Sequence, residues 1–217
     1  MRLLSRDEVR SVYDAFGARQ DSQGWYEDVP LAELKEHMRF QDAEFVLELG
    51  SGTGKLAHEI VTELTPAGTN YLGLDVSPVM VNLARNRLRH CGNAFAVVGD
   101  VRAPLPLADG SVSHVVAAYV LDIFSEGDIR SIYREVGRVL RPGGLFGAVS
   151  LSTGGNLWSQ MASRVWSFVH TMRPQAVGGC RPVELLACVP DGFDVAHSCK
   201  KIGGGIPSEV VVARKPR

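Results

Sequence analysis

The sequence predicts an α/β protein with a Rossmann-like, doubly wound sheet of seven strands, mostly parallel, with an antiparallel final strand and helical lid segments. Three observations predict this class. Between residues 45 and 150, five short apolar segments alternate with segments of helical periodicity, which is typical of a parallel sheet with right-handed crossovers. A glycine-rich loop follows the first apolar segment, as in folds that bind ligands at strand ends. Two late strand-like segments are joined without a helix, which requires an antiparallel pair.

Residues 1–44 precede the first strand and are expected to form a helical lid over the ligand-binding face. An apolar stripe predicts a helix from Ser5 to about Phe16, and Gly17 ends it. Residues 19–28 are polar and turn-like. A second helix is expected to begin at Pro30 and to run to about Met38, because proline is favoured in the first helical turn.

The first strand and the glycine loop form the central motif of the sequence. Apolar residues from Phe45 to Leu49 predict a buried strand, and Leu56 and Ile60 begin a helical periodicity after the loop. Glycine permits positive φ angles and lets a ligand lie against the backbone, while the start of the helix offers unpaired N–H groups. A small-molecule site is therefore expected at the carboxyl end of this strand.

Three glycine-loop chemistries are compared for this motif. A P-loop is rejected because Leu49 stands where its first glycine belongs and Leu56 where its Mg²⁺-binding hydroxyl belongs. The dinucleotide fingerprint fits poorly because Lys55 occupies the position of its third glycine. The pattern E-x-G-x-G-x-G, from Glu48 to Gly54, remains as the third chemistry, beside the simpler interpretation of a glycine-rich turn without a ligand.

The second strand is expected over residues 69–74 and ends in Asp75, which lies 75 − 54 = 21 residues after Gly54. An acid at this strand tip can accept hydrogen bonds from both hydroxyls of a nucleoside ribose. The alternative role, capping the next helix, is already available to Ser77, which precedes Pro78. Asp75 is therefore predicted to bind ribose.

The remaining segments complete the alternation and then depart from it. His114 falls near the start of the fourth strand, away from the ligand face, and is interpreted as structural. The basic residues that end the helix at 78–90 are interpreted as a solvated face favoured by the helix dipole. The other expected segments are strands 94–98 and 112–120, helix 126–140, strand 145–150, helices 154–173 and 183–188, and strands 192–199 and 209–213. We expect one domain with a lid (1–44), a ligand-binding core (45–150), a helical insert (151–190) and an antiparallel strand pair (191–217).

Composition limits the possible partners. The net charge of −1 gives no electrostatic case for a nucleic-acid partner, and the hydrophobic content of 45% is ordinary for a globular protein. Apolar runs are too short to cross a bilayer and no signal-peptide core is present, so a cytoplasmic protein is expected. The four cysteines form no CxxC pair and the six histidines no HxxxH pair, so no metal site is predicted.

The ordered motifs resemble those of the class I S-adenosylmethionine-dependent methyltransferases, particularly the small-molecule type that includes ubiquinone/menaquinone biosynthesis. The resemblance covers about residues 45–150 and the final strands, whereas residues 1–44 and 152–190 match no particular subfamily. The motifs are Glu48 to Gly54, Asp75, Asp100, the loop Tyr119-Val120-Leu121, and Leu140 to Gly144.

This resemblance implies S-adenosylmethionine as the cofactor, and the glycine loop would pass under its methionine portion. The loop residues concerned are Gly50, Ser51, Gly52 and Gly54, with Glu48 oriented towards the amino end of the cofactor.

The resemblance also assigns the nucleoside end of the cofactor. Asp75 would hold the ribose hydroxyls, and Val76 would flank the adenine. Asp100 would accept a hydrogen bond from the adenine amino group, with Val101 beside it. Tyr119 would lie near the sulfonium.

The sequence identifies no definite general base. Many relatives carry an apolar residue followed by histidine after the fourth strand, whereas this chain carries Asp122 there. Asp122 could orient or deprotonate an acceptor, or it could cap the helix that begins near Glu126, and His170 is a more remote candidate for acid/base work. Tyr13 and Tyr26 are the preferred lid contacts. Other aromatic residues that could wall the pocket, or simply pack, are Phe16, Trp25, Trp158 and Trp166.

The predicted reaction is in-line transfer of a methyl group from S-adenosylmethionine to a small-molecule or lipid-like acceptor. A sulfonium has a good neutral leaving group, so the protein contributes mainly alignment and exclusion of water. The alternative is a non-catalytic protein that binds S-adenosylmethionine as a partner or sensor. A nicotinamide oxidoreductase is disfavoured because no tyrosine begins a Tyr-x-x-x-Lys motif. The sequence does not determine the acceptor, the methylated atom or the oligomeric state.

Overall fold

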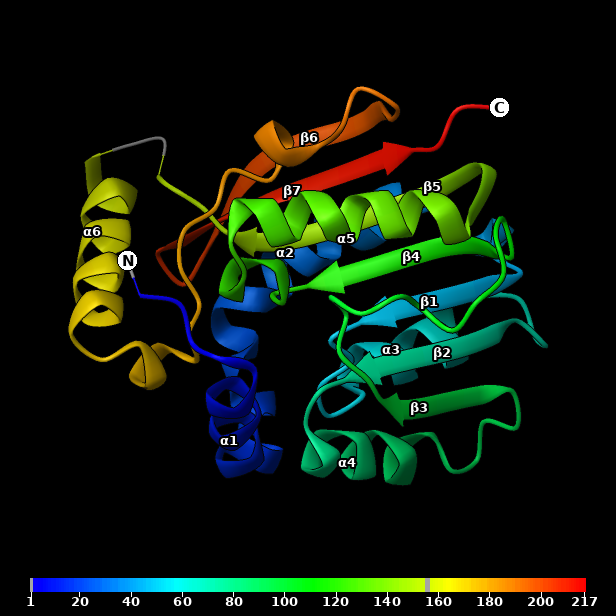
Figure 1. Cartoon of the computed structure of the whole chain (residues 1–217), viewed down its shortest axis with the longest axis horizontal. Coiled ribbons are helices and arrows are strands. Elements are labelled where there is room, and N and C mark those ends of the chain that lie inside the picture. The colour runs from blue at the N-terminus through cyan, green and yellow to red at the C-terminus, as the bar shows by residue number, and fades with distance from the viewer. Residues whose placement is uncertain (1, 155–156) are drawn as a thin grey trace.

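The computed structural model describes residues 2–154 and 157–217 and contains one sheet of seven strands (Figure 1). Its spatial order is β3-β2-β1-β4-β5-β7-β6. Within the described residues β7 runs opposite to the other six strands, which confirms the predicted sheet. The strands are β1 (Phe45–Leu49), β2 (Asn70–Asp75), β3 (Ala94–Val98), β4 (Val112–Ala118), β5 (Leu140–Leu151), β6 (Asp194–Gly203) and β7 (Ile206–Arg214).

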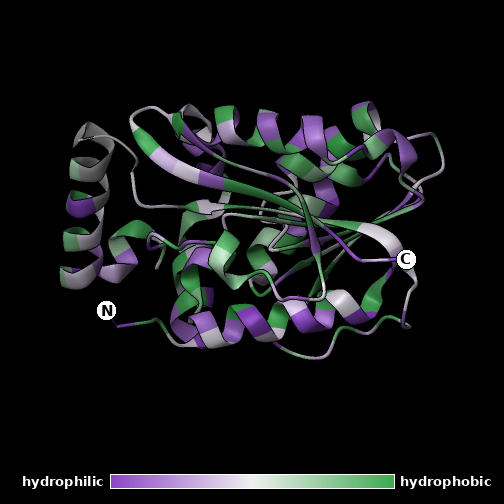
Figure 2. Ribbon diagram, turned by 90° about the horizontal axis from the view of Figure 1, so that it is seen from above, coloured by the Kyte–Doolittle hydropathy of each residue, from purple (hydrophilic) through white to green (hydrophobic). Residues whose placement is uncertain are grey.

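Helices cover both faces of the sheet (Figures 1 and 2). Alternate residues of its strands supply two main hydrophobic cores, one on each face. In β4, for example, Val115 faces the core under α5, whereas Val116 faces the core under α2 and α3. The α-helices are α1 (Arg6–Phe16), α2 (Gly24–His37), α3 (Lys55–Glu59), α4 (Pro78–Leu88), α5 (Glu126–Val139) and α6 (Leu157–Met172). The other helical segments are η1 (Gly17–Gln23), η2 (Phe40–Asp42), η3 (Ile60–Leu64), η4 (Leu121–Ile123), η5 (Pro174–Val177) and η6 (Leu186–Cys188).

The expected start of the second lid helix is wrong. The chain is helical from Gly24, so Pro30 lies inside α2 and residues 19–28 are η1 followed by the first turn of α2. A proline there leaves the carbonyl of Tyr26 without its helical partner. This carbonyl instead lies against Gly203 at the end of β6, where any side chain would collide with it. Packing of α2 on β6 and β7 therefore outweighs the local signals for a turn.

Other boundaries also shift. Residues 141–144, expected to lie between the helix over 126–140 and the next strand, already belong to β5, because Leu140 pairs with Val112. The helix expected over 183–188 is reduced to the turn η6, and β6 and β7 are longer than predicted. The expected insert over 154–173 contains α6, although residues 155–156 lie outside the described part.

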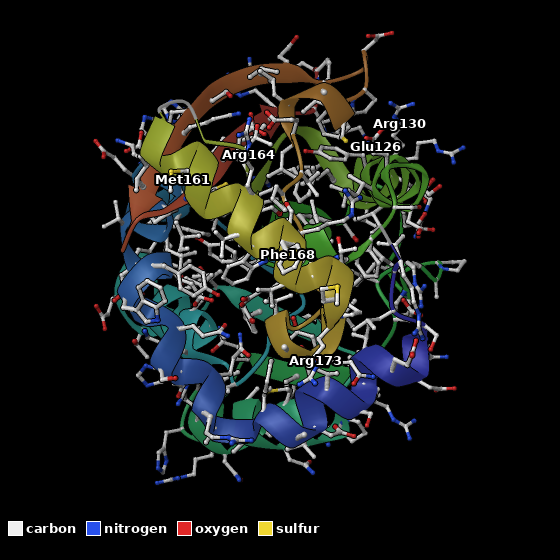
Figure 3. The ribbon with its side chains drawn as sticks, turned by 90° about the vertical axis from the view of Figure 1, so that its left-hand side faces the viewer. Glu126, Arg130, Met161, Arg164, Phe168 and Arg173 are labelled. Atoms are coloured by element: carbon white, nitrogen blue, oxygen red, sulfur yellow. The ribbon has the colours of Figure 1, made fainter. Side chains whose placement is uncertain are left out.

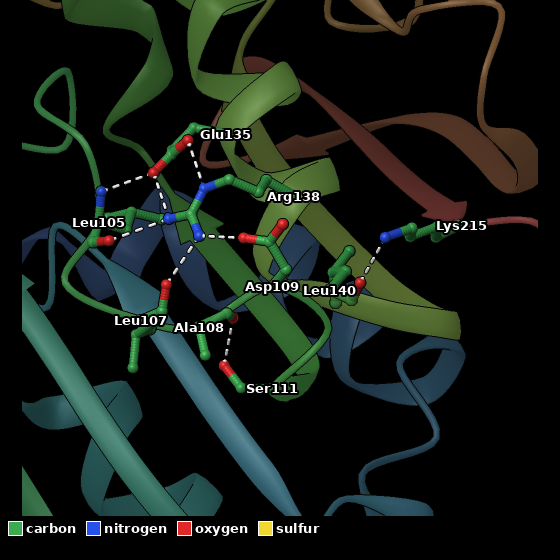
Figure 4. Close-up of polar contacts among 9 residues, drawn as sticks. All are labelled: Leu105, Leu107, Ala108, Asp109, Ser111, Glu135, Arg138, Leu140 and Lys215. Atoms are coloured by element: carbon green, nitrogen blue, oxygen red, sulfur yellow. Dashed lines mark hydrogen bonds and ion pairs between the residues drawn. The ribbon is translucent and has the colours of Figure 1, made fainter.

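A loop far from the glycine motif is held by Arg138 of α5 (Figure 4). Its guanidinium donates to the carbonyls of Leu105 and Leu107 and pairs with Asp109 and Glu135. The α6 helix stands at one end of the molecule, with Met161 and Phe168 projecting outward (Figure 3). No helix in residues 2–154 and 157–217 is long and apolar enough to cross a membrane.

Candidate active site

A cavity of about 1130 Å³, including its open mouth, lies at the carboxyl ends of the first four strands. The core contributes Glu48 near the end of β1 and Asp75 as the last residue of β2, together with Asp100 after β3 and Tyr119 after β4. The lid contributes residues of α1 and α2, and the described residues concerned include Val9, Tyr13, Glu27 and Leu31. This is the position at which open parallel sheets bind their ligands.

The glycine loop is fixed to the neighbouring strand by its own backbone. The N–H groups of Gly50 and Ser51 both donate to the carbonyl of Leu74, at 2.8 and 2.9 Å. Gly50 has a φ of 71°, and a side chain there would collide with Val120, so glycine is required. Gly54 begins α3 with its backbone packed against Ala84 of α4, and it does not line the cavity among the described residues.

Asp75 connects the tip of β2 to the glycine loop. Its Oδ2 accepts from the Gly52 N–H at 2.9 Å, and its Oδ1 accepts from the Ser77 N–H at 2.8 Å. Burial raises the pKa of Asp75 despite these hydrogen bonds. Ser77 itself caps α4 by accepting from Met80, as expected. Asp75 therefore faces the cavity, with Val76 beside it on the wall.

Glu48 is a buried carboxyl on the floor of the cavity. It accepts a hydrogen bond from the hydroxyl of Tyr71 on β2. Burial raises the pKa of Glu48 to about 8, so the carboxyl is largely protonated at neutral pH. A cationic ligand group would favour its ionised form.

Asp100 and Val101 lie on the cavity wall after β3, as expected for residues beside the adenine. The Asp100 carboxylate accepts from the backbone and guanidinium of Arg102, and Arg6 of α1 lies 3.4 Å away. Burial would raise the pKa of Asp100, but the hydrogen bonds from Arg102 outweigh it and hold the pKa low. An adenine amino group would donate to the Asp100 carboxylate, which already accepts from the guanidinium of Arg102.

The three predicted tyrosines occupy different places. Tyr13 lines the cavity, with its hydroxyl 3.7 Å from Cys180 Sγ. Tyr119 also lines it and shares a 2.9 Å hydrogen bond with the hydroxyl of Ser208 on β7. Tyr26 lies behind Tyr119, with ring centroids 5.6 Å apart, and is absent from the described wall.

Neither candidate for acid/base work lines the described cavity wall. Asp122 is fully buried, and its Oδ2 accepts from the Leu151 N–H at 3.2 Å. Burial raises the pKa of Asp122 to about 6. Its alternative role as a cap is wrong, because Ser125 caps α5. His170 is buried, and its Nε2 lies 3.1 Å from the carbonyl of Gly179.

The other aromatic residues pack within or under the lid. The Trp166 indole donates to the carbonyl of Cys180, and its ring lies 6.3 Å from that of Tyr26. Phe16 packs against Tyr13, and Trp25 against Tyr26. The side chain of Trp158 falls outside the described part of the chain.

Sequence reasoning missed the contact between the lid and the glycine loop. Asp21 of η1 accepts from the hydroxyl of Thr53 and pairs with Arg87 of α4 at 2.6 Å. Arg87 had been interpreted as part of a solvated face, which is wrong. The hydroxyl of Thr53 inside the glycine motif was the one local signal for this contact.

Sequence reasoning also missed Glu27 of α2, which lines the cavity. Burial raises the pKa of Glu27 to about 7, against the opposing effect of nearby Lys55. Glu48, the other wall carboxyl with a strongly raised pKa, titrates higher, at about 8. Its position depends on how the lid folds over the sheet, and no motif marks it.

This fold and cavity define a Rossmann-like protein that binds a small molecule at its strand tips. Residues 46–144 match the family model described as a methyltransferase domain. The chain is 30% identical to the ubiquinone/menaquinone biosynthesis C-methyltransferase of Acidiphilium cryptum, over 76% of this chain and 67% of that protein. It is 29% identical to the malonyl-acyl-carrier-protein O-methyltransferase of a Marinomonas strain, over 70% of this chain and 54% of that protein.

Solved structures agree on the fold. The methyltransferase in a complex with the Trm112 methyltransferase activator of Haloferax volcanii is 19% identical, with a TM-score of 0.71 over 96% of this chain and 98% of that one. The chain belongs to the class I S-adenosylmethionine-dependent methyltransferase family, as the motifs predicted. S-adenosylmethionine is the cofactor of that family.

Proposed function

We propose that this protein transfers a methyl group from S-adenosylmethionine to a small-molecule or lipid-like acceptor. The observation that carries the proposal is the cavity that joins the glycine loop, Glu48 and Asp75 at the ends of adjacent strands. The names of the curated relatives, one for quinone biosynthesis and one for an acyl carrier, support an acceptor of this class.

The residues present fit this cofactor. No described heavy atom lies within 4 Å of the position that a side chain of Gly52 would take, so the cavity reaches the bare backbone there. Glu48 offers a carboxyl for the ammonium of the methionine portion, and Asp75 offers acceptors for ribose hydroxyls. Val76 and Val101 offer apolar surface for a flat base.

When bound, S-adenosylmethionine supplies an electrophilic methyl group. The protein's part is to align the acceptor with that group and to exclude water. Tyr119, which Ser208 and Tyr26 hold in place, forms a fixed wall at the end of β4. For an acceptor that must lose a proton, Glu27 is the wall residue proposed to take it, since its pKa lies near neutrality.

Calorimetric titration with S-adenosylmethionine tests the cofactor site. Asp75→Ala removes the acceptor for two backbone N–H groups and for the ribose, so we expect affinity to fall by about 10-fold to 100-fold. Asp109→Ala, at an exposed acid remote from the cavity, is the matched control and should bind like the wild type. Equal binding by Asp75→Ala would contradict the proposed site.

Turnover is tested separately, by measuring S-adenosylhomocysteine released with quinone, fatty-acid and small amine acceptors. Release that depends on one acceptor class supports the enzyme and identifies that class. Tight binding of S-adenosylmethionine with no release for any class would favour the alternative, a non-catalytic binding partner or sensor.

A further inference from the structure

Five polar side chains meet where α2 crosses the edge strand β6. Glu33 and His37 lie one helical turn apart on α2, so they share one face of that helix. His197, Cys199 and Lys201 occupy alternate positions of β6, and are less exposed than the residues between them. The two sets face each other across the helix–strand contact.

These groups gather around the Glu33 carboxylate. His197 Nε2 lies 2.9 Å from Oε1, and the Cys199 thiol donates to the same oxygen at 3.5 Å. His37 Nδ1 lies 3.9 Å from Oε1 and shares a 3.0 Å hydrogen bond with the carbonyl oxygen of Glu33. The ligand atoms of Glu33, His37 and His197 all lie within 4.8 Å of one another, and Cys199 Sγ lies next to this group.

An ordinary ion pair does not account for this arrangement. Lys201 pairs with the other oxygen, Oε2, at 2.7 Å, and so satisfies that atom alone. His197 Nε2 is buried and has no partner of hydrogen-bonding geometry among the described residues, although it lies close to Oε1. The rings of His37 and His197 are stacked with centroids 3.6 Å apart. Two imidazoles and the Cys199 thiol thus surround Oε1 of Glu33.

We propose that Glu33, His37 and His197 bind a zinc-type divalent ion, with Cys199 as the fourth ligand. This donor set of nitrogen, oxygen and sulfur is one that Zn²⁺ accepts in tetrahedral sites. Binding ionises the Cys199 thiol, its proton goes to solvent, and no electrons are exchanged. On binding, the stacked imidazoles and the Cys199 side chain rotate to direct two nitrogens and the sulfur at the ion. Lys201 remains on Oε2 and orients the carboxylate.

Such a site would fasten the lid to the sheet. Glu33 and His37 follow Glu27 and Leu31 on the same helix, and the latter two line the cavity. An ion that joins α2 to β6 therefore fixes the helix that forms one wall of the site. Spacing along the sequence does not reveal the cluster, because Cys199 and Glu33 are 166 residues apart in the chain.

The test uses the full chain with its purification tag removed, stripped with a chelator and titrated with Zn²⁺ alone against a chromophoric competitor. The wild type is expected to bind one ion per chain. His197→Ala and Cys199→Ser should each weaken Zn²⁺ binding by at least about tenfold. His58→Ala, which removes an exposed histidine outside the cluster, is the matched control and should bind like the wild type.

Thermal unfolding with and without Zn²⁺ gives a second readout. Zn²⁺ should raise the Tm of the wild type and of His58→Ala but not that of His197→Ala. If His197→Ala does not fold, His37→Gln, which alters a half-buried histidine of the same cluster, is used instead. No stoichiometric binding by the wild type, or equal loss in His58→Ala, would overturn the proposal. Metal binding is read without the cofactor, so this result is independent of the methyl-transfer proposal.

Discussion

The buried carboxyl of Glu48 accepts a hydrogen bond from the hydroxyl of Tyr71, and the two residues come from the adjacent parallel strands β1 and β2. Burial raises the pKa of Glu48 from its ordinary 4.5 to about 8. Between these two pKa values the folded chain keeps a proton on Glu48 that the unfolded chain has lost. The stability that this proton contributes is complete below about pH 4.5 and is lost as pH rises through about 8.

Glu48→Gln should therefore gain stability relative to the wild type as pH rises. The side chain of glutamine does not titrate, so the difference in Tm should widen from about pH 5 to about pH 8 and then level off. Thermal unfolding at several pH values measures it. Glu63→Gln, at an exposed carboxyl, is the control and should show no such trend. A constant difference for Glu48→Gln would mean that the carboxyl is ionised throughout.

Glu27→Gln should lower kcat by about 100-fold for an acceptor that must lose a proton, with little change in KM. Burial raises the pKa of Glu27 to about 7, so the wild-type rate should rise with pH through neutrality, whereas the variant should show a flat profile. The pH dependence of initial rates measures both effects. Glu36→Gln alters an exposed acid near the other end of the same helix and should keep the wild-type profile.

Asp122→Ala should destabilise the protein by about 2 kcal/mol, because the N–H of Leu151 loses its buried acceptor. Asp122→Asn keeps an acceptor oxygen and should recover most of that loss. Since Asp122 does not line the described wall, Asp122→Asn should keep kcat within a few-fold of the wild type. Denaturant unfolding and initial rates measure the two effects. A large fall in kcat for a stable Asp122→Asn would restore its role in catalysis.

Tyr26→Ala should destabilise the protein by about 3 kcal/mol, since it removes a buried ring that packs on Tyr119 and Trp166. It should also weaken S-adenosylmethionine binding, because Tyr119 loses its support. Tyr26→Phe keeps these ring contacts but loses the hydrogen bond to Gln23 and the hydroxyl contact with Glu27, so its stability and its S-adenosylmethionine affinity should stay near those of the wild type. Chemical denaturation and calorimetric titration compare them. Similar losses in both variants would assign the effect to the hydroxyl instead.

The sheet and the part of the cavity beside the glycine loop could be predicted because their signals are local. The strands of a buried parallel sheet are short apolar runs, and the loop from Gly50 to Gly54 stands between two periodicities. Asp75 follows from its place at a strand tip, and it does face the cavity.

The lid could not be predicted in the same way. Gly24 disfavours a helix locally and Pro30 marks a helix start rather than a helix interior, and contacts of α2 with β6 and β7 outweigh both signals. For the same reason neither Glu27 on the cavity wall nor the pairing of Glu33 with His197 can be read from spacing. Each depends on tertiary contacts between distant parts of the chain.

Tyr119 has a φ of 51°, a left-handed conformation that is unfavourable by about 1 kcal/mol for a residue with a β-carbon. Glycine would relax the main chain at this bend but would leave a hole between Tyr26 and Ser208. The strained backbone at Tyr119 therefore lets its phenol ring reach both Ser208 on β7 and Tyr26 on α2. A methyl acceptor would meet a rigid partition at the end of β4, and any change in acceptor preference would have to come from the opposite, helical side of the chamber.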